Sequence, residues 1–89
     1  MNWPLSYQVL IERRALKELS KLPAEITRRA SLAIDGLAAQ PRPPGAKKLH
    51  GSRDQWRTRV GDYRILYEIN DRAREIRVFA VGHRREIYR

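Results

Sequence analysis

The sequence predicts a small α+β domain with the order β-α-α-β-β-β, in which a helical hairpin covers one face of a curved, mostly antiparallel four-stranded sheet. Three observations predict this fold. Segments 15–22 and 26–37 repeat their apolar residues with a helical period and are separated by Pro23. Apolar and aromatic residues alternate with others on both sides of Gly61-Asp62, which is the pattern of a strand hairpin. The length of 89 residues suits a single domain, 1–89, with a small core.

The first strand is expected over residues 5–11, because apolar and aromatic residues alternate there. From about Glu12 the period becomes helical, and the apolar residues of the first helix fall on one side: Ala15, Leu16, Leu19 and Leu22. Pro23 ends this helix and suits the first turn of the second one. The second helix carries its own apolar stripe: Ile26, Ala30, Ala33, Ile34 and Leu37. Gly36 lies inside this stripe and is expected to allow close packing.

The second half of the chain is expected to form three further strands. Its prolines should hold the connector 40–46 extended and stiff, and residues 47–54 lead into the hairpin. A turn near 70–74 precedes the last strand, 75–81, whose nearly continuous apolar residues predict a central place in the sheet. Gly82 is expected to end this strand, and residues 83–89 form a basic tail.

The hairpin centred on Gly61-Asp62 predicts which side chains share a face. A two-residue loop that begins with glycine suits a type II′ turn. The pairs that follow are Val60 with Tyr63, Arg59 with Arg64, Thr58 with Ile65, Arg57 with Leu66, and Trp56 with Tyr67. The aromatic and apolar members, among them Trp56, Tyr63 and Tyr67, should face the core, and the other face carries Arg57, Arg59 and Arg64. Like charges directly opposite each other are unfavourable in a sheet, so this arginine face suits the binding of an anion.

The composition favours an anionic partner for the whole domain. The formal net charge is +9 and the pI is about 10.8, and segments 41–64 and 84–89 carry net charges of +5 and +2. Such an excess is typical of proteins that bind nucleic acid, an acidic protein or a membrane surface. No apolar run is long enough to span a membrane. The first residues lack the pattern of a signal peptide, so a cytoplasmic location is expected.

The residue types available for chemistry point to a phosphate rather than to a metal or a nucleophile. The absence of cysteine excludes disulfides and thiol chemistry, and no metal-ligand cluster, phosphate-binding glycine loop or Ser-His-Asp order is present. Neither a metal nor a cofactor is expected. Of the two histidines, His50 falls in a turn and is interpreted as an ordinary solvated side chain, whereas His83 adjoins the basic tail and is a candidate for proton transfer.

Three motifs resemble the RelE/ParE toxin superfamily, and its RelE branch in particular. They are Lys48-Leu49-x-Gly51, the hairpin from Trp56 to Tyr67, and Val81-Gly82-His83-Arg84-Arg85-x-x-Tyr88. The resemblance covers nearly the whole chain and implies a RelE-like fold. It also implies the toxin of a type II toxin–antitoxin system, which cuts mRNA in the ribosomal A site through the RNA's own 2′-hydroxyl and so inhibits translation. The implied enzyme is a metal-independent endoribonuclease.

The resemblance also implies roles for individual residues. Arg64 matches the arginine that stabilises charge on the scissile phosphate. Arg84 matches the arginine that acts as the leaving-group acid or as a transition-state contact, and Tyr88 the tyrosine that stacks on or orients the cleaved nucleotide. Arg57 and Arg59 stand where well-known members carry lysines, and arginine cannot act as a base. They are therefore expected to clamp the phosphate, and the base would be Tyr88, His83 or a ribosomal group. The cations expected to contact RNA or the ribosome are Lys47, Lys48, Arg53 and Arg85.

Partners and alternatives complete these expectations. The implied partners are the ribosome with its mRNA and a small acidic, RelB-like antitoxin that forms a hetero-oligomer with the toxin; no membrane is involved. One alternative is a ParE-like toxin with the same fold that binds DNA gyrase and has no nuclease activity. A second alternative is a nucleic-acid-binding module without toxicity.

Overall fold

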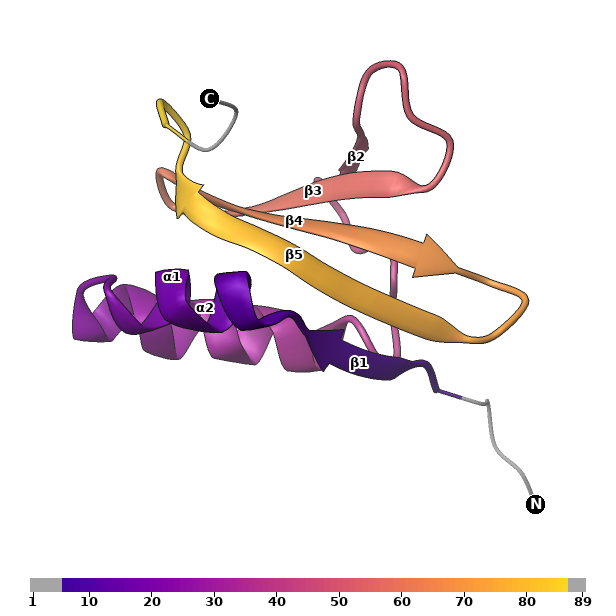
Figure 1. Ribbon diagram of the computed structural model, residues 1–89, viewed down its shortest axis with the longest axis horizontal. Helices are drawn as coiled ribbons and strands as arrows, with labels where there is room; N and C mark the ends of the chain where they lie inside the picture. Colours follow the sequence, from indigo (N-terminus) through magenta and orange to yellow (C-terminus); the bar gives the residue numbers. More distant parts are fainter. Residues whose placement is uncertain (1–5, 87–89) are drawn as a thin grey trace.

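The computed structural model describes residues 6–86 and shows a five-stranded sheet with both helices on one of its faces (Figure 1). The elements are β1 (Gln8–Ile11), α1 (Arg13–Ser20), α2 (Ala24–Gly36), β2 (Lys47–Lys48), β3 (Gln55–Val60), β4 (Tyr63–Asn70) and β5 (Glu75–His83). The predicted α+β class and the order of the main elements are confirmed. The strand count is different, because two residues of the expected lead-in, Lys47 and Lys48, pair with β3 as an additional edge strand.

The strand order is β1-β5-β4-β3-β2, and β1 runs parallel to β5 while all other neighbours are antiparallel. The last strand therefore lies inside the sheet, as its apolar sequence predicts. It runs through Gly82 to His83, so the expected end at Gly82 is wrong. The first strand begins at Gln8, later than expected, and Leu5 lies outside the described residues.

The core lies between the sheet and the helical hairpin. Its fully or nearly fully buried members come from both layers: Ala15, Leu19, Ala30, Ile34, Leu37, Val60, Ile65, Tyr67, Ile69, Ile76, Val78 and Val81. The side chain of Thr27 ties the two helices together, because its hydroxyl donates a 2.9 Å hydrogen bond to the carbonyl of Leu19. Pro23 is the residue before α2 rather than its first turn. Gly36 ends α2, and a Cβ there would meet nothing within 4 Å, so its expected role in close packing is wrong.

A bulge in β5 explains the continuous apolar run of that strand. Leu66 pairs with Ala80 and Tyr67 with Val78, which leaves Phe79 as an extra residue in the ladder. Ala80 and Leu66 consequently point away from the helices. Leu49 and Phe79 pack against them in a second, small apolar cluster. The face opposite the helices, which we call the open face, is therefore partly covered by Leu49 rather than lined by arginines alone.

Candidate functional site

The hairpin between β3 and β4 builds the centre of the candidate site, and its predicted register is confirmed at every pair. Gly61 has a φ of +61°, as the first residue of a II′ turn requires. Val60, Ile65 and Tyr67 are buried under the helices. By the alternation of side chains along a strand, Arg57, Arg59 and Arg64 lie together on the open face.

The register of β5 extends this arrangement by one strand. Arg64 pairs with Arg59 on one side and with Gly82 on the other. Because Gly82 has no side chain, no neighbour projects beside Arg64 from β5. The next row along the open face contains Lys47, Arg57, Leu66 and Ala80. Three cations on β2 and β3, Lys47, Arg57 and Arg59, thus share the open face with Arg64.

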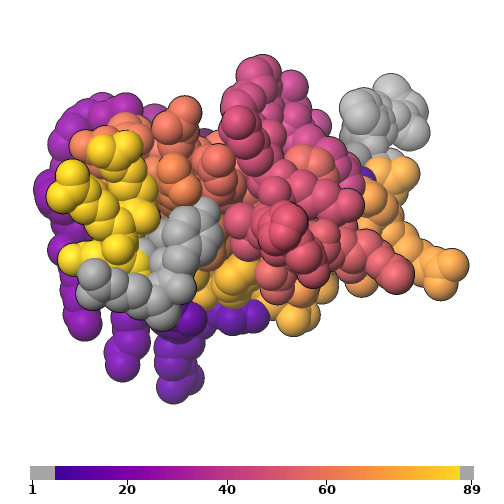
Figure 2. Space-filling view, turned by 90° about the horizontal axis from the view of Figure 1, so that it is seen from above, coloured from indigo at the N-terminus to yellow at the C-terminus, as the bar shows by residue number. Residues whose placement is uncertain are grey.

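A pocket of about 480 Å³ opens on this part of the face. Its lining residues are Lys48, Leu49, His50, Gln55, Arg57 and Arg64. Three of the six are cations and none is a carboxylate, so the pocket is suited to an anionic ligand. Figure 2 looks onto the open face and shows the pink and red segment that contains β2 and the start of β3 spread over the sheet.

His50 is exposed to solvent, as expected from the sequence, but it also lines this pocket, which the sequence analysis did not anticipate. The turn that carries His50 follows β2 and precedes β3, and the sequence shows only that a turn is present. Nothing in the local pattern indicates that Leu49 folds back onto the open face of β4 and β5. That tertiary contact is what brings His50 to the pocket of Arg57 and Arg64.

Arg84 lies beside the hairpin turn. Its backbone N–H donates a 2.9 Å hydrogen bond to the carbonyl of Asp62, and its guanidinium Nε lies 3.9 Å from a carboxylate oxygen of the same residue. The structure thus brings Arg84 to the end of the sheet at which Arg59 and Arg64 lie. About half of its side chain is exposed to solvent (47 %).

His83, in contrast, lies on the helix side of the sheet. Its ring packs edge-on against Tyr63, with the two ring centres 5.4 Å apart. Both side chains line a separate pocket of about 470 Å³ together with residues of α1 such as Glu18. The imidazole Nδ1 accepts a 3.1 Å hydrogen bond from the backbone N–H of Arg85. The structure therefore does not bring His83 together with the arginines of the open face.

The remaining predicted site residues are exposed or lie outside the described part of the chain. Lys47, Lys48, Arg53 and Arg85 are all exposed. Tyr88 lies outside the described residues. Within residues 6–86, no group of three or more histidine, aspartate or glutamate side chains is arranged to hold a metal ion. Over the same residues, neither helix is long and apolar enough to cross a membrane.

A second polar cluster lies at the other end of the sheet and has a structural role. Arg42 donates a 2.9 Å hydrogen bond to Asp71 and stacks on Trp56, while Tyr7 donates to the same carboxylate. The Arg42 guanidinium, with help from Tyr7, lowers the pKa of Asp71. The buried Tyr67 hydroxyl donates a 2.7 Å hydrogen bond to the carbonyl of Pro41, and burial raises its pKa to about 12.

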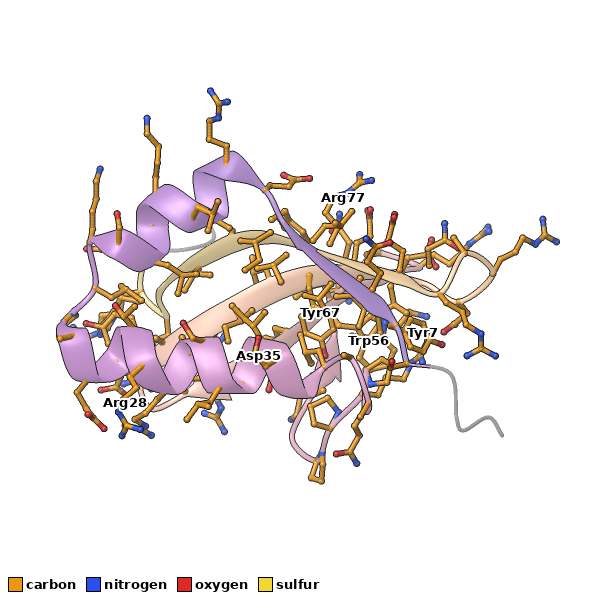
Figure 3. All side chains as sticks on the ribbon, turned by 90° about the horizontal axis from the view of Figure 1, so that it is seen from below. Tyr7, Arg28, Asp35, Trp56, Tyr67 and Arg77 are labelled. Atoms are coloured by element: carbon orange, nitrogen blue, oxygen red, sulfur yellow. The ribbon has the colours of Figure 1, made fainter. Side chains whose placement is uncertain are left out.

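These contacts hold the connector between α2 and β2 against the sheet. Figure 3, seen from the helix side, shows Tyr7, Trp56 and Tyr67 near one another, towards the end of the sheet beyond α2. The connector is thus anchored by side chains as well as stiffened by its prolines. Its path determines where β2 pairs with β3 and, through β2, where the turn with His50 begins.

Comparisons with known proteins agree with the fold and with the motifs. Residues 9–88 match the family model described as the ParE toxin of the type II toxin–antitoxin system parDE. The candidate toxin RelE1 of Methanocaldococcus jannaschii is 31 % identical over 68 residues, which cover 73 % of this chain and 76 % of the relative.

Solved structures of RelE proteins superpose closely on the chain. RelE in the archaeal RelE–RelB complex of Pyrococcus horikoshii has a TM-score of 0.80 and 31 % identity, and the match covers 92 % of this chain and 99 % of the other. The isolated RelE toxin of E. coli has a TM-score of 0.76 and 26 % identity, covering 88 % and 84 %. The RelBE2 toxin–antitoxin complex of Mycobacterium tuberculosis has a TM-score of 0.78 and 27 % identity, and the match covers 89 % of this chain and 99 % of the other.

Proposed function

The chain belongs to the RelE/ParE superfamily of toxins, and we propose that it is a ribosome-dependent endoribonuclease that cuts mRNA in the A site and thereby inhibits translation. The observation that carries the proposal is the cationic pocket of the open face, where Arg57 and Arg64 line one cavity and Arg59 lies directly opposite Arg64. An arrangement that places like charges side by side is unfavourable by itself. It becomes favourable when a phosphate lies between the charges.

The proposed chemistry is attack of the RNA 2′-hydroxyl on the adjacent phosphate, which leaves a cyclic phosphate on the upstream fragment. Negative charge accumulates on the phosphate oxygens in the transition state. Arg57, Arg59 and Arg64 stabilise it, since preorganised positive charge is often the largest single contribution to catalysis. Guanidinium groups suit this task because they present several donors in a planar fork and remain protonated. The reaction needs no metal ion in this scheme.

Two further residues belong to the proposal. Arg84 is positioned beside the hairpin turn by its contacts with Asp62, and we assign it to the region of the leaving group. Tyr88 is assigned to stacking on the cleaved nucleotide, an interaction worth about 1–3 kcal/mol. His83 is left out of the reaction, because its ring packs on Tyr63 at the helix side.

The ribosome is proposed to supply what the isolated domain lacks, which is the in-line placement of the substrate. The exposed cations Lys47, Lys48, Arg53 and Arg85 are assigned to contacts with ribosomal RNA or with the mRNA backbone. Activity on free RNA is therefore expected to be low. Binding to ribosomes should weaken steeply as the salt concentration rises, since phosphate contacts release counterions.

The proposed antitoxin is an acidic, RelB-like protein. Three of the similar solved structures, from Pyrococcus horikoshii, Mycobacterium tuberculosis and E. coli, are described as RelE–RelB or RelBE complexes. With a net charge of +9 on 89 residues, this chain offers strong electrostatic attraction to an acidic segment. Such a segment would neutralise the open face and block access of RNA to it.

The proposal is tested with purified protein and ribosomes that hold a defined mRNA in the A site. The expected result is a single cut, a 2′,3′-cyclic phosphate on the upstream fragment, and little cutting of the same mRNA without ribosomes. Arg57→Ala should lower the rate by about 10²–10³-fold, as removal of one preorganised donor does. Arg28→Ala is the matched control, because Arg28 lies on α2 and pairs with Glu25. Intact mRNA together with inhibition of DNA gyrase would instead establish the ParE-like alternative.

A further inference from the structure

The proposed site holds several cations but needs a group that accepts the proton of the 2′-hydroxyl. Guanidinium groups do not serve, because they stay protonated. The His83 ring packs against Tyr63 on the helix side of the sheet. We propose that His50 is the general base of this reaction, an inference that rests on the endoribonuclease function proposed above.

The turn that carries His50 is held in place from both sides. The N–H of Leu49 donates a 2.8 Å hydrogen bond to the carbonyl of Gln55, and the N–H of Ser52 donates a 3.1 Å bond back to Leu49. Gly51 has a φ of +78°, a conformation that other residues rarely adopt, and it turns the chain directly after His50. The imidazole therefore extends from a hydrogen-bonded turn and not from a long unsupported loop.

The side chain of Leu49 determines over which part of the sheet this turn lies. It packs against Leu66 and Ala80 on the open face. Leu66 is directly opposite Arg57 in the β3–β4 ladder, and Arg64 is two residues before Leu66 on the same face of β4. Figure 1 shows the β2–β3 connection rising on the side of the sheet away from the helices. The residue next to Leu49 thus reaches the pocket of Arg57 and Arg64.

The lining of the pocket leaves one suitable base. Of the six residues, Leu49 and Gln55 do not titrate and two are arginines. Lys48 is exposed, whereas lysines that act as bases in proteins are desolvated. Imidazole is the side chain that exchanges a proton most readily near pH 7. His50 is the one imidazole among the six lining residues and is therefore the candidate for the base.

The step balances with the atoms of the RNA, His50 and water. An imidazole nitrogen of His50 takes the proton of the 2′-hydroxyl, and the 2′-oxygen forms its bond to phosphorus. The bond between phosphorus and the 5′-oxygen breaks, and the 5′-oxygen leaves with the electron pair and takes a proton from water. The products are a 2′,3′-cyclic phosphate and a 5′-hydroxyl. The imidazolium then returns its proton to solvent, while Arg57 and Arg64 hold the phosphate oxygens throughout.

The test is a single-turnover measurement of mRNA cleavage on programmed ribosomes at saturating toxin, across pH 5.5 to 8.5. The wild-type rate constant is expected to rise with pH through roughly pH 6–7, where imidazoles lose their proton. His50→Gln and His50→Ala should lower the plateau by about 10²–10⁴-fold, the usual contribution of a general base, and should abolish this rise. Ribosome binding of both variants should stay unchanged, and added imidazole should restore part of the rate of His50→Ala. The charged groups that face His50 in the pocket are Lys48, Arg57 and Arg64.

Two comparison variants make the result specific. His83→Gln removes the other imidazole of the chain from the opposite side of the sheet and should keep the rise with pH. Lys48→Met removes the rival base from the same pocket. Loss of the pH-dependent rise in either of these variants, with the rise retained in His50→Gln, overturns the inference. So does a His50→Gln protein that cuts within about threefold of the wild type.

The two levels of the proposal fail in different ways. If the wild type leaves ribosome-bound mRNA intact, the endoribonuclease function fails and the role of His50 fails with it. If the wild type cuts and the His50 variants cut equally well, only the role of His50 is wrong. Thermal unfolding of the variants, followed by circular dichroism, establishes in each case that the protein measured is folded.

Discussion

Replacing Arg59 with threonine should raise the stability of the domain while it lowers its activity. Arg59 lies directly opposite Arg64 in the β3–β4 ladder and is exposed. Directly opposed residues have Cα atoms about 4.5–5.5 Å apart, so the two guanidinium groups repel each other in the absence of RNA. Cross-strand pairs contribute roughly 0.2–1 kcal/mol. Threonine fits a strand well and removes the repulsion.

The expected gain in the free energy of unfolding is therefore about 0.2–1 kcal/mol at low salt, which corresponds to an increase in Tm of roughly 1–8 °C for a domain of this size. The gain should disappear in roughly 1 M salt, where the screening length falls to about 3 Å. Cleavage of ribosome-bound mRNA by the same variant should fall about 10²–10³-fold. Thermal unfolding at two salt concentrations and a cleavage assay are sufficient.

Arg77→Thr is the matched control, because Arg77 is also an arginine on a strand but is surrounded by carboxylates rather than by another arginine. It lies opposite Glu68 in the β4–β5 ladder and 3.7–3.8 Å from the carboxylates of Glu12 and Glu75. Its removal should leave the free energy of unfolding unchanged or lower it by less than about 1 kcal/mol, as for other exposed ion pairs. The reasoning would be refuted if Arg59→Thr were less stable than the wild type by an amount that does not change with salt. Such a result would mean that Arg59 and Arg64 do not repel each other in the absence of an anion.

Three further predictions concern stability and are measured by chemical or thermal unfolding. Tyr67→Phe removes the 2.7 Å hydrogen bond to the Pro41 carbonyl and should lower the free energy of unfolding by about 1–2 kcal/mol. Because burial raises the folded pKa of Tyr67 to about 12 from 10.0, this contribution is complete below pH 10 and is lost as the pH rises from 10 towards 12. A difference in the free energy of unfolding between wild type and variant that stays unchanged over that range would contradict the assignment. Asp71→Asn should lower the free energy of unfolding by less than about 1 kcal/mol, since the pair with Arg42 is exposed. Because the folded pKa of Asp71 is lowered, this loss relative to the wild type should be present above pH 4 and vanish as the pH falls below 3.8. Gly36→Ala should stabilise α2 by about 0.4–1 kcal/mol, because a Cβ there meets nothing within 4 Å; a destabilised variant would contradict this.

Patterns of neighbouring residues were sufficient to predict the strand hairpin on which the candidate site is built. The glycine of the II′ turn and the alternation on either side of it predict the register of β3 and β4, and hence that Arg57, Arg59 and Arg64 share a face. The same rules place the helical hairpin on the opposite face. The register depends on near neighbours in sequence, where backbone geometry leaves few alternatives. The place of the helices follows from matching apolar faces, since the helical stripes need the apolar face of the sheet as their partner.

Contacts between distant residues were not predictable in this way. The bulge at Phe79 changes which residues of β5 face the helices, and no local pattern indicates where a ladder slips by one residue. His83 was expected near the arginines from its neighbours in sequence, but alternation along β5 places it on the other side with Tyr63. His50 is exposed, as expected, but its place at the pocket was not predictable, because it depends on the packing of Leu49 on Leu66 and Ala80.

The most direct test of the central claim is a map of mRNA 5′ ends in cells after brief induction of the chain, with wild type beside Arg64→Ala. A folded Arg64→Ala protein is confirmed first by its unfolding transition. The account predicts new 5′ ends within translated codons for the wild type, none in untranslated RNA, and a loss of these ends together with relief of translation arrest for Arg64→Ala. Arrested cells whose mRNA 5′ ends are unchanged would contradict it.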